Sequence, residues 1–154
     1  MLWLPSRIWL GLIACLALGA CASLTAKSDP PPMYDVRSAV VLSGPGIPAE
    51  LLSATGSRIN AAIAATTHEE ALPRVVLTVR IVEVQKGLGY QADRNSARVS
   101  INAASVDSGE VVAVASFDVT TFARDPNLAD QIMAEDIAAR IRSTFSLNMP
   151  RGGA

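Results

Sequence analysis

The segment from residue 74 to 85, "RVVLTVRIVEVQ", constrains the fold more than any other part of the chain. Its apolar residues recur at every second position, as Val75, Leu77, Val79 and Ile81. Side chains of a β-strand alternate between the two faces of a sheet, so this spacing predicts a strand with one buried face. Other elements of the chain must then cover that face.

Five further segments have the patterns of strands or helices. Strands are expected at 34–42, 97–106 and 110–122, and helices at 48–66 and from Asp125 to about Ser146. Pro48 suits the first turn of one helix, while Asp125 and Pro126 suit the cap and first position of the other. The order β-α-β-β-β-α predicts an α+β fold, a four-stranded mixed sheet with two helices packed on one face.

Apolar residues at helical spacing predict which side of each helix is buried. These residues are Leu52, Gly56, Ile59 and Ile63 in the first helix, and Leu128, Ile132, Ile137, Ile141 and Phe145 in the second. Half of the chain is apolar but only 5% is aromatic, so the core must consist mostly of Val, Ile, Leu and Ala. We expect a single α+β domain at 34–147 and a disordered tail at 148–154.

The hairpin around Asp107, Ser108 and Gly109 allows a prediction of register. A two-residue loop would place Val99 opposite Asp118. A three-residue loop pairs Val99 with Phe117, Ile101 with Ala115 and Ala103 with Ala113, and sets Arg98 opposite Asp118 on the other face. It also puts Gly109 at the position that favours a left-handed backbone. We therefore predict the three-residue loop, because it pairs apolar with apolar residues.

The N-terminal segment contains a basic residue, then an apolar run, then a cysteine. Arg7 precedes an apolar run at 8–20, whose 13 residues suit a signal peptide but fall short of the roughly 20 that span a bilayer. "LGAC" at 18–21 resembles the lipobox of bacterial lipoproteins. This resemblance implies cleavage after a signal peptide at 1–20 and diacylation of Cys21 through its sulfur. Cys15 also fits the motif, although with a shorter apolar run, and an uncleaved anchor is a further alternative.

Residues 21–33 are expected to form a lipidated, Pro-rich tether. Pro30, Pro31 and Pro32 favour the extended polyproline conformation, a stiff spacer between lipid and domain. With Cys15 removed and Cys21 lipidated, no cysteine would remain for a disulfide. Ala22 stands where an aspartate would resemble an inner-membrane retention signal. We therefore expect the lipid anchor at Cys21 to hold the protein in the outer membrane, facing the periplasm.

The predicted domain resembles small bacterial envelope lipoproteins of unknown function. The resemblance rests on the "D-x-G-E" turn at 107–110 and on a C-terminal helix like "AEDIAARIRSTF". The order of elements is also similar to the small α/β domain of TolB-type and curli-assembly-type periplasmic proteins. What this resemblance implies is assembly or scaffolding at the envelope, without naming a functional residue.

No segment has the pattern of a catalytic site. His68 is the only histidine, and the end of a helix accounts for it and for the adjacent Glu69 and Glu70 without a metal. The glycines of "KGLGYQ" at 86–91 lack a phosphate-loop lysine and a following helix. The 13 basic and 14 acidic residues are spread along the chain, unlike the basic patch of a nucleic-acid-binding protein. We expect no enzyme, no cofactor, no metal and no nucleic-acid partner.

Two features remain as candidate partner-binding surfaces. One is the sheet face away from the helices, where the strand patterns place Arg80, Val82, Val84, Val112 and Val114. The other is the loop 86–96, which presents Leu88 and Tyr90 between glycines. Scattered exposed valines and a merely solvated loop are the alternatives.

These features favour a lipid-anchored periplasmic binding or scaffolding protein that contributes to envelope complexes by its sheet face or by strand addition. The alternative is an auxiliary lipoprotein of a transport system that handles lipid or another apolar cargo. That alternative requires a dry cavity between helices and sheet.

Overall fold

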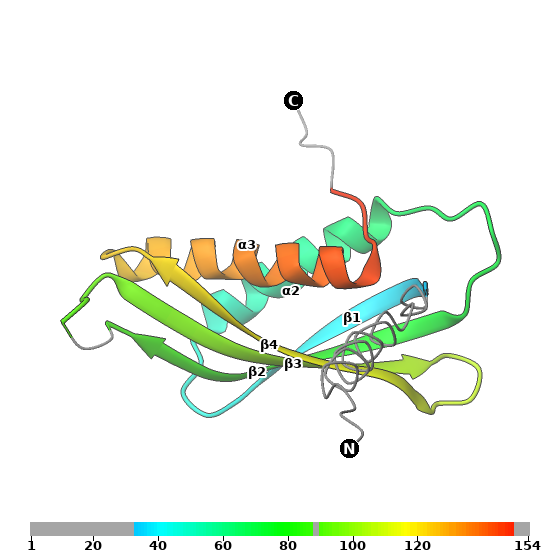
Figure 1. The fold of residues 1–154 in the computed structure, drawn as a ribbon, viewed down its shortest axis with the longest axis horizontal. Coiled ribbons are helices and arrows are strands. Elements are labelled where there is room, and N and C mark those ends of the chain that lie inside the picture. The colour runs from blue at the N-terminus through cyan, green and yellow to red at the C-terminus, as the bar shows by residue number, and fades with distance from the viewer. Residues whose placement is uncertain (1–32, 88–89, 150–154) are drawn as a thin grey trace, which may run out of the picture. The chain divides into compact units, whose positions relative to one another are not determined.

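The computed structural model describes residues 33–87 and 90–149. The predicted signal peptide, Cys21, most of the tether, Leu88 and the last five residues lie outside the described residues. Within them the elements are β1 (Asp35–Ser43), α2 (Ala49–Ala64), β2 (Arg74–Lys86), β3 (Arg94–Ser105), β4 (Val111–Phe122) and α3 (Pro126–Phe145) (Figure 1). No helix in this part of the chain is long and apolar enough to cross a membrane.

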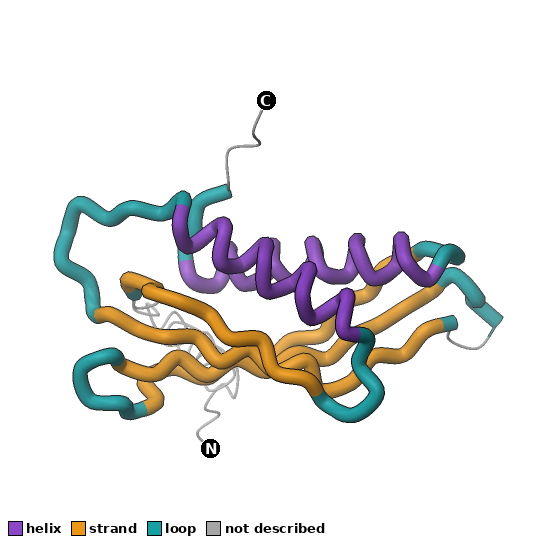
Figure 2. The backbone as a smooth tube through the Cα atoms, turned by 180° about the vertical axis from the view of Figure 1, so that it is seen from behind, coloured by secondary structure: helices purple, strands orange, loops and turns teal. Residues whose placement is uncertain are grey.

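The four strands form one sheet in the order β1-β2-β3-β4, which confirms the predicted fold class. β1 and β2 are parallel, whereas β2, β3 and β4 are antiparallel neighbours. Both helices lie on the same face of the sheet (Figure 2). α2 packs against β1 and α3, and α3 packs against β4 and β3.

The hairpin between β3 and β4 has the predicted register. Val99 pairs with Phe117, Ile101 with Ala115 and Ala103 with Ala113. Gly109 has a φ of 75°, the left-handed conformation that the three-residue loop requires. β3 begins at Arg94, earlier than predicted, so the connection from β2 is shorter than the expected loop at 86–96.

Side chains of the sheet and the helices fill the space between the two layers. The predicted row Val75, Leu77, Val79 and Ile81 is fully buried, as are Val99 and Ile101 of β3. The helices contribute Leu51, Ile59, Met133, Ile137 and Ile141. As the composition predicts, aliphatic residues and alanine make up nearly all of this core.

The buried side of α2 differs by about one residue from the prediction. Leu51 and Thr55 are fully buried, whereas Leu52 and Ile63 are only half-buried. Adjacent leucines at the start of the helix allow either to face the sheet, and the sequence does not distinguish them. Gly56 lies against β1, where an added Cβ would stand 3.6 Å from a methyl of Val41.

α3 begins as predicted, because the Asp125 side chain accepts hydrogen bonds from the backbone N–H groups of Asn127 and Leu128. The placement of Leu128 in the buried stripe is wrong, since it is 54% exposed. Leu147, the last residue of the predicted domain, is buried. Asn148, the first residue of the predicted disordered tail, donates its backbone N–H to Thr66 Oγ1 at 2.7 Å.

A candidate interaction surface on the sheet

The face of the sheet opposite the helices is open and carries exposed apolar side chains over part of its area. Paired positions place Val40, Thr78, Asn102 and Val114 in one row across the four strands. The next row contains Leu42, Arg80, Ser100 and Ser116. Val40 and Val114, which lie on the two edge strands, are 52% and 71% exposed. We call this surface, with Val111 and Val112, the open face.

Of the predicted candidates on this face, Arg80, Val82, Val112 and Val114 are exposed. Val84 is not on the open face, so that prediction is wrong. A bulge between Ile81 and Glu83 inserts Val82 and reverses the alternation. Val84 consequently pairs with the buried Ala97 and packs against the core.

The sequence interpretation missed the contribution of β1. Val40 and Leu42 are exposed on the open face beside Thr78 and Arg80. The signal was present in "SAVVL" at 38–42, where Ala39 and Val41 alternate with Val40 and Leu42. All four residues are apolar and differ only in size. The pattern alone therefore did not reveal which pair faces the helices.

Three charged side chains, Glu83, Arg98 and Asp118, lie at the other end of the open face. Arg98 Nε lies 3.1 Å from Asp118 Oδ1, which confirms the predicted cross-strand pair, and its guanidinium lies 3.8 Å from Glu83 Oε2. These side chains are all about half exposed, so the pairs contribute little to stability. They divide the open face into an apolar end and a charged end.

The two free edges of the sheet differ in their protection. On β1, the side-chain amide of Asn60 from α2 accepts a hydrogen bond from Ala39 N at 3.3 Å and donates one to Ala39 O at 3.2 Å. A bulge at Arg37 interrupts the same strand. In the described part of the chain, β4 has no comparable side-chain bond to its outer backbone groups.

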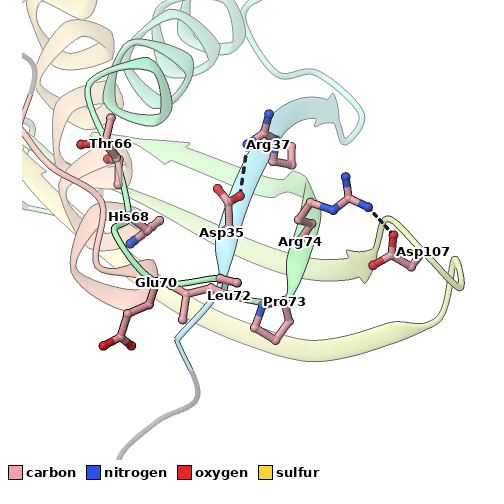
Figure 3. Close-up of a pocket in the computed structure, with 11 residues that line it drawn as sticks. Asp35, Arg37, Thr66, His68, Glu70, Leu72, Pro73, Arg74 and Asp107 are labelled. Atoms are coloured by element: carbon pink, nitrogen blue, oxygen red, sulfur yellow. Dashed lines mark hydrogen bonds and ion pairs between the residues drawn. The ribbon is translucent and has the colours of Figure 1, made fainter.

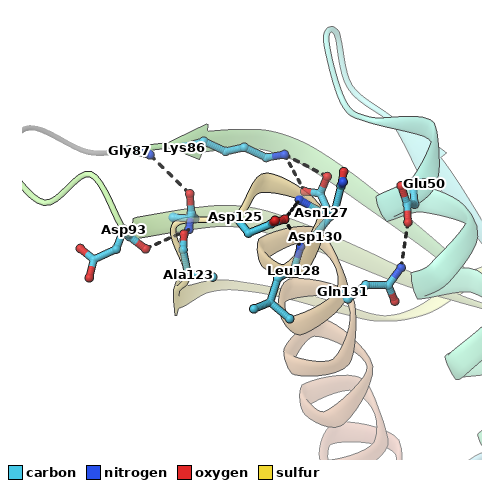
Figure 4. Close-up of polar contacts among 11 residues, drawn as sticks. Glu50, Lys86, Gly87, Asp93, Ala123, Asp125, Asn127, Leu128, Asp130 and Gln131 are labelled. Atoms are coloured by element: carbon cyan, nitrogen blue, oxygen red, sulfur yellow. Dashed lines mark hydrogen bonds and ion pairs between the residues drawn. The ribbon is translucent and has the colours of Figure 1, made fainter.

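The second predicted surface, the loop after β2, is anchored at its base (Figure 4). Asn95 donates to the carbonyls of Asp93 and Ala123, each at 3.0 Å. Lys86 Nζ lies 2.8 Å from Oδ1 of the buried Asp130, which ties the end of β2 to α3. Tyr90 is fully exposed. These contacts hold the ends of β2 and β4 and the start of β3 and α3 together.

His68 lines a surface cavity of about 520 Å³ beside the start of β1 and β2 (Figure 3). Two arginines in its wall are already neutralised, since Arg37 pairs with Asp35 at 3.1 Å and Arg74 with Asp107 at 2.5 Å. An anion would have to displace those carboxylates. The described residues contain no group of His, Cys, Asp and Glu side chains arranged to hold a metal.

A polar network joins the outer sides of the two helices. Glu135 of α3 accepts from Arg58 of α2 at 3.1 Å and from Arg142 at 2.7 Å. The next residue, Asp136, has no such partner. Burial raises the pKa of its carboxyl, and the charge of Glu135 adds to the rise. Glu135 therefore links the two helices, whereas Asp136 is a partly buried carboxylate that makes no ion pair with the described residues.

Comparison with known proteins shows similarity of fold. No family model and no curated protein matches the sequence. PelC from Paraburkholderia phytofirmans, crystallised as a dodecamer, is 16% identical with a TM-score of 0.51, covering 77% of this chain and 92% of that chain. A candidate lipoprotein from Caulobacter crescentus is 18% identical, with a TM-score of 0.45 and coverage of 73% and 88%. A minor lipoprotein from Acinetobacter baumannii is 12% identical, with a TM-score of 0.41 and coverage of 79% and 99%.

Proposed function

We propose that this chain is a lipid-anchored protein of the bacterial envelope that binds other proteins through the open face and does not catalyse a reaction. The observation that carries the proposal is the exposure of apolar side chains on that face, at Val40 of one edge strand and Val114 of the other. Contiguous exposed apolar side chains are typical of a binding surface, and on this face Val111, Val112 and Val114 are exposed close together on β4.

The proposed location follows from the N-terminal sequence. The lipobox-like "LGAC" at 18–21 supports lipidation of Cys21 and a place in the outer membrane facing the periplasm. Residues 22–33 would then link the lipid to the domain. The similarity in fold to PelC, which was crystallised as a dodecamer, supports including further copies of this chain among its partners.

A carrier of apolar cargo is less well supported. Such a carrier requires a dry, apolar cavity, and here side chains such as Leu77, Ile101 and Ile137 fill the space between helices and sheet. Three surface cavities of about 420–520 Å³ in the described residues include charged side chains in their walls, among them Arg74, Arg140 and Arg142. This observation favours a partner-binding role.

The anchor is tested by the intact mass of the full chain purified from bacterial membranes. We expect a chain that begins at Cys21 and carries acyl groups. Cys21→Ser should abolish the modification, whereas the matched variant Cys15→Ser should retain it. An unmodified N-terminus in a soluble protein would contradict the proposed location.

The surface is tested by chemical crosslinking in membranes, comparing Val114→Asp with Leu128→Asp. Both residues are exposed and apolar, but Leu128 lies on α3, away from the open face. We expect crosslinked products to disappear in Val114→Asp and to persist in Leu128→Asp. Unchanged products in Val114→Asp would refute a role for this face.

A further inference from the structure

The outer edge of β4 presents a long row of backbone groups. In an antiparallel pair, residues alternate between those bonded to the neighbouring strand and those that point away. Ala123 N donates to Asp93 O of the chain leading into β3, which fixes this alternation. The N–H and C=O groups of Val114, Ser116, Asp118, Thr120 and Phe122 therefore point outward. The hydrogen bonds of the described residues give these groups no partner.

This edge lacks the usual protection against strand addition. Natural edge strands carry prolines, lysines or bulges, or are covered by other elements. From Ala113 to Phe122, β4 has no proline, no bulge and one charged residue, Asp118. The charge of Asp118 is balanced by Arg98 at 3.1 Å. The opposite edge, on β1, is instead covered by Asn60.

We propose that two copies of this chain pair antiparallel through β4, with Phe117 facing Phe117 of the second copy. This inference names one partner within the proposed function and rests on it. The register places Val114 opposite Thr120, Ser116 opposite Asp118 and Val112 opposite Phe122 of the second copy. It uses nearly the whole strand and sets no two aspartates directly opposite each other. The neighbouring register, in which Ser116 faces Ser116, would instead place Val114 opposite Asp118.

The surroundings of β4 leave room for this pairing. A groove of about 420 Å³ runs between the strand and α3, and Ala139 and Ser143 form part of its α3 wall. The same wall also includes Asp136 and Arg140, and the small side chains between them leave space for a second copy beside the strand. Arg140 is held over the Phe117 ring, with its guanidinium carbon 5.9 Å from the ring centre. The paired strands would form one continuous sheet of both copies.

Engineered disulfides test the register in the full chain, purified from membranes in a Cys15→Ser background. In an antiparallel sheet, two opposite residues that exchange backbone hydrogen bonds have Cα atoms about 5.5 Å apart. A disulfide bridges this distance. The double variant Val114→Cys with Thr120→Cys should form a covalent dimer on mild oxidation. Its two cysteines lie six residues apart on one strand, too far to bridge within a copy. Val114→Cys or Thr120→Cys alone should give no dimer.

A proline variant tests the edge independently. Thr120 N–H points outward, so Thr120→Pro removes a bond to the second copy without breaking the ladder to β3. We expect Thr120→Pro to reduce the mass measured by light scattering to that of one chain, with an unchanged circular dichroism spectrum. The matched variant Thr120→Val keeps the N–H and should keep the dimer.

Two results would overturn the inference. One is a Thr120→Pro protein that assembles as the parent does, and the other is a dimer formed equally by Val114→Cys alone. If the chain forms no dimer but the lipidated protein still crosslinks to another envelope protein, the proposed pairing is wrong and the proposed function stands. If the parent protein is neither lipidated nor crosslinked to another protein, the proposed function itself is wrong.

Discussion

The side-chain amide of Asn60 on α2 bonds both backbone groups of Ala39 on β1, at 3.3 and 3.2 Å. It occupies the place that a neighbouring strand would take. One edge of the sheet is thereby closed by a residue from the helix layer, while β4 is not closed in this way within the described residues. This asymmetry gives the domain a direction in which further strands can add.

Replacing Asn60 should both destabilise the domain and open the β1 edge. Asn60→Ala removes the two bonds to Ala39 and a third to the carbonyl of Gly56. We expect a loss of about 1–2 kcal/mol in the free energy of unfolding by urea, since each bond contributes roughly 1 kcal/mol or less at this exposure. Ser57→Ala, on an exposed position of the same helix, should change stability by less than about 0.5 kcal/mol. Equal effects of the two variants would contradict this role.

Two glycines should respond to alanine in opposite directions. Gly109 has a φ of 75°, so Gly109→Ala should cost about 1 kcal/mol of stability from the backbone alone. Gly56 is inside α2 with only an ordinary 3.6 Å contact for an added Cβ, so Gly56→Ala should gain about 0.5–1 kcal/mol. Thermal unfolding of both variants measures the difference. A loss of stability in Gly56→Ala would show tighter packing on Val41 than the distance indicates.

The ion pair between Lys86 and Asp130 should be worth more than pairs on the surface. Lys86→Met leaves a carboxylate that is 7% exposed without its cation, and we expect a loss of about 1–3 kcal/mol. Arg37→Met breaks an exposed pair with Asp35 and should cost less than about 1 kcal/mol. Urea unfolding compares the two. Similar losses in both variants would mean that the burial of Asp130 does not matter.

The adjacent carboxylates Glu135 and Asp136 should have opposite effects on stability at neutral pH. Burial, with the charge of Glu135 in addition, raises the pKa of Asp136, so its ionisation opposes folding. Stability from this group is full at a pH below the ordinary value of 3.8 and is lost as pH rises through the folded value. Asp136→Asn should therefore stabilise at pH 7 and lose this advantage near pH 3. Glu135→Gln should destabilise at pH 7, because Arg58 and Arg142 each bond a different oxygen of this carboxylate, and glutamine offers only one acceptor oxygen and no negative charge.

The sequence predicted those elements whose signals are local. Alternation at Val75, Leu77 and Val79 identified β2, and pairing apolar with apolar residues identified the register at Ile101 and Ala115. The Asp125 cap was also correct, because a cap depends on only a few neighbouring residues. In each case the interacting groups are close in sequence or joined by a short turn.

The candidate site was predicted less completely, because contacts between distant segments determine it. The bulge that turns Val84 to the core fits the sequence as well as unbroken alternation does. The contact of Asn60 with Ala39 joins residues 21 positions apart, so no local sequence pattern predicts it. Val40 and Leu42 become part of the open face only when β1 joins the edge of the sheet.

Site-specific photo-crosslinking in intact bacteria tests the central claim most directly. A photoreactive residue at Val114, on the open face, is compared with one at Ser57, on the exposed side of α2. The account predicts a discrete protein adduct from position 114 and none from position 57. The absence of an adduct at 114, or equal adducts from both positions, would contradict binding through the open face.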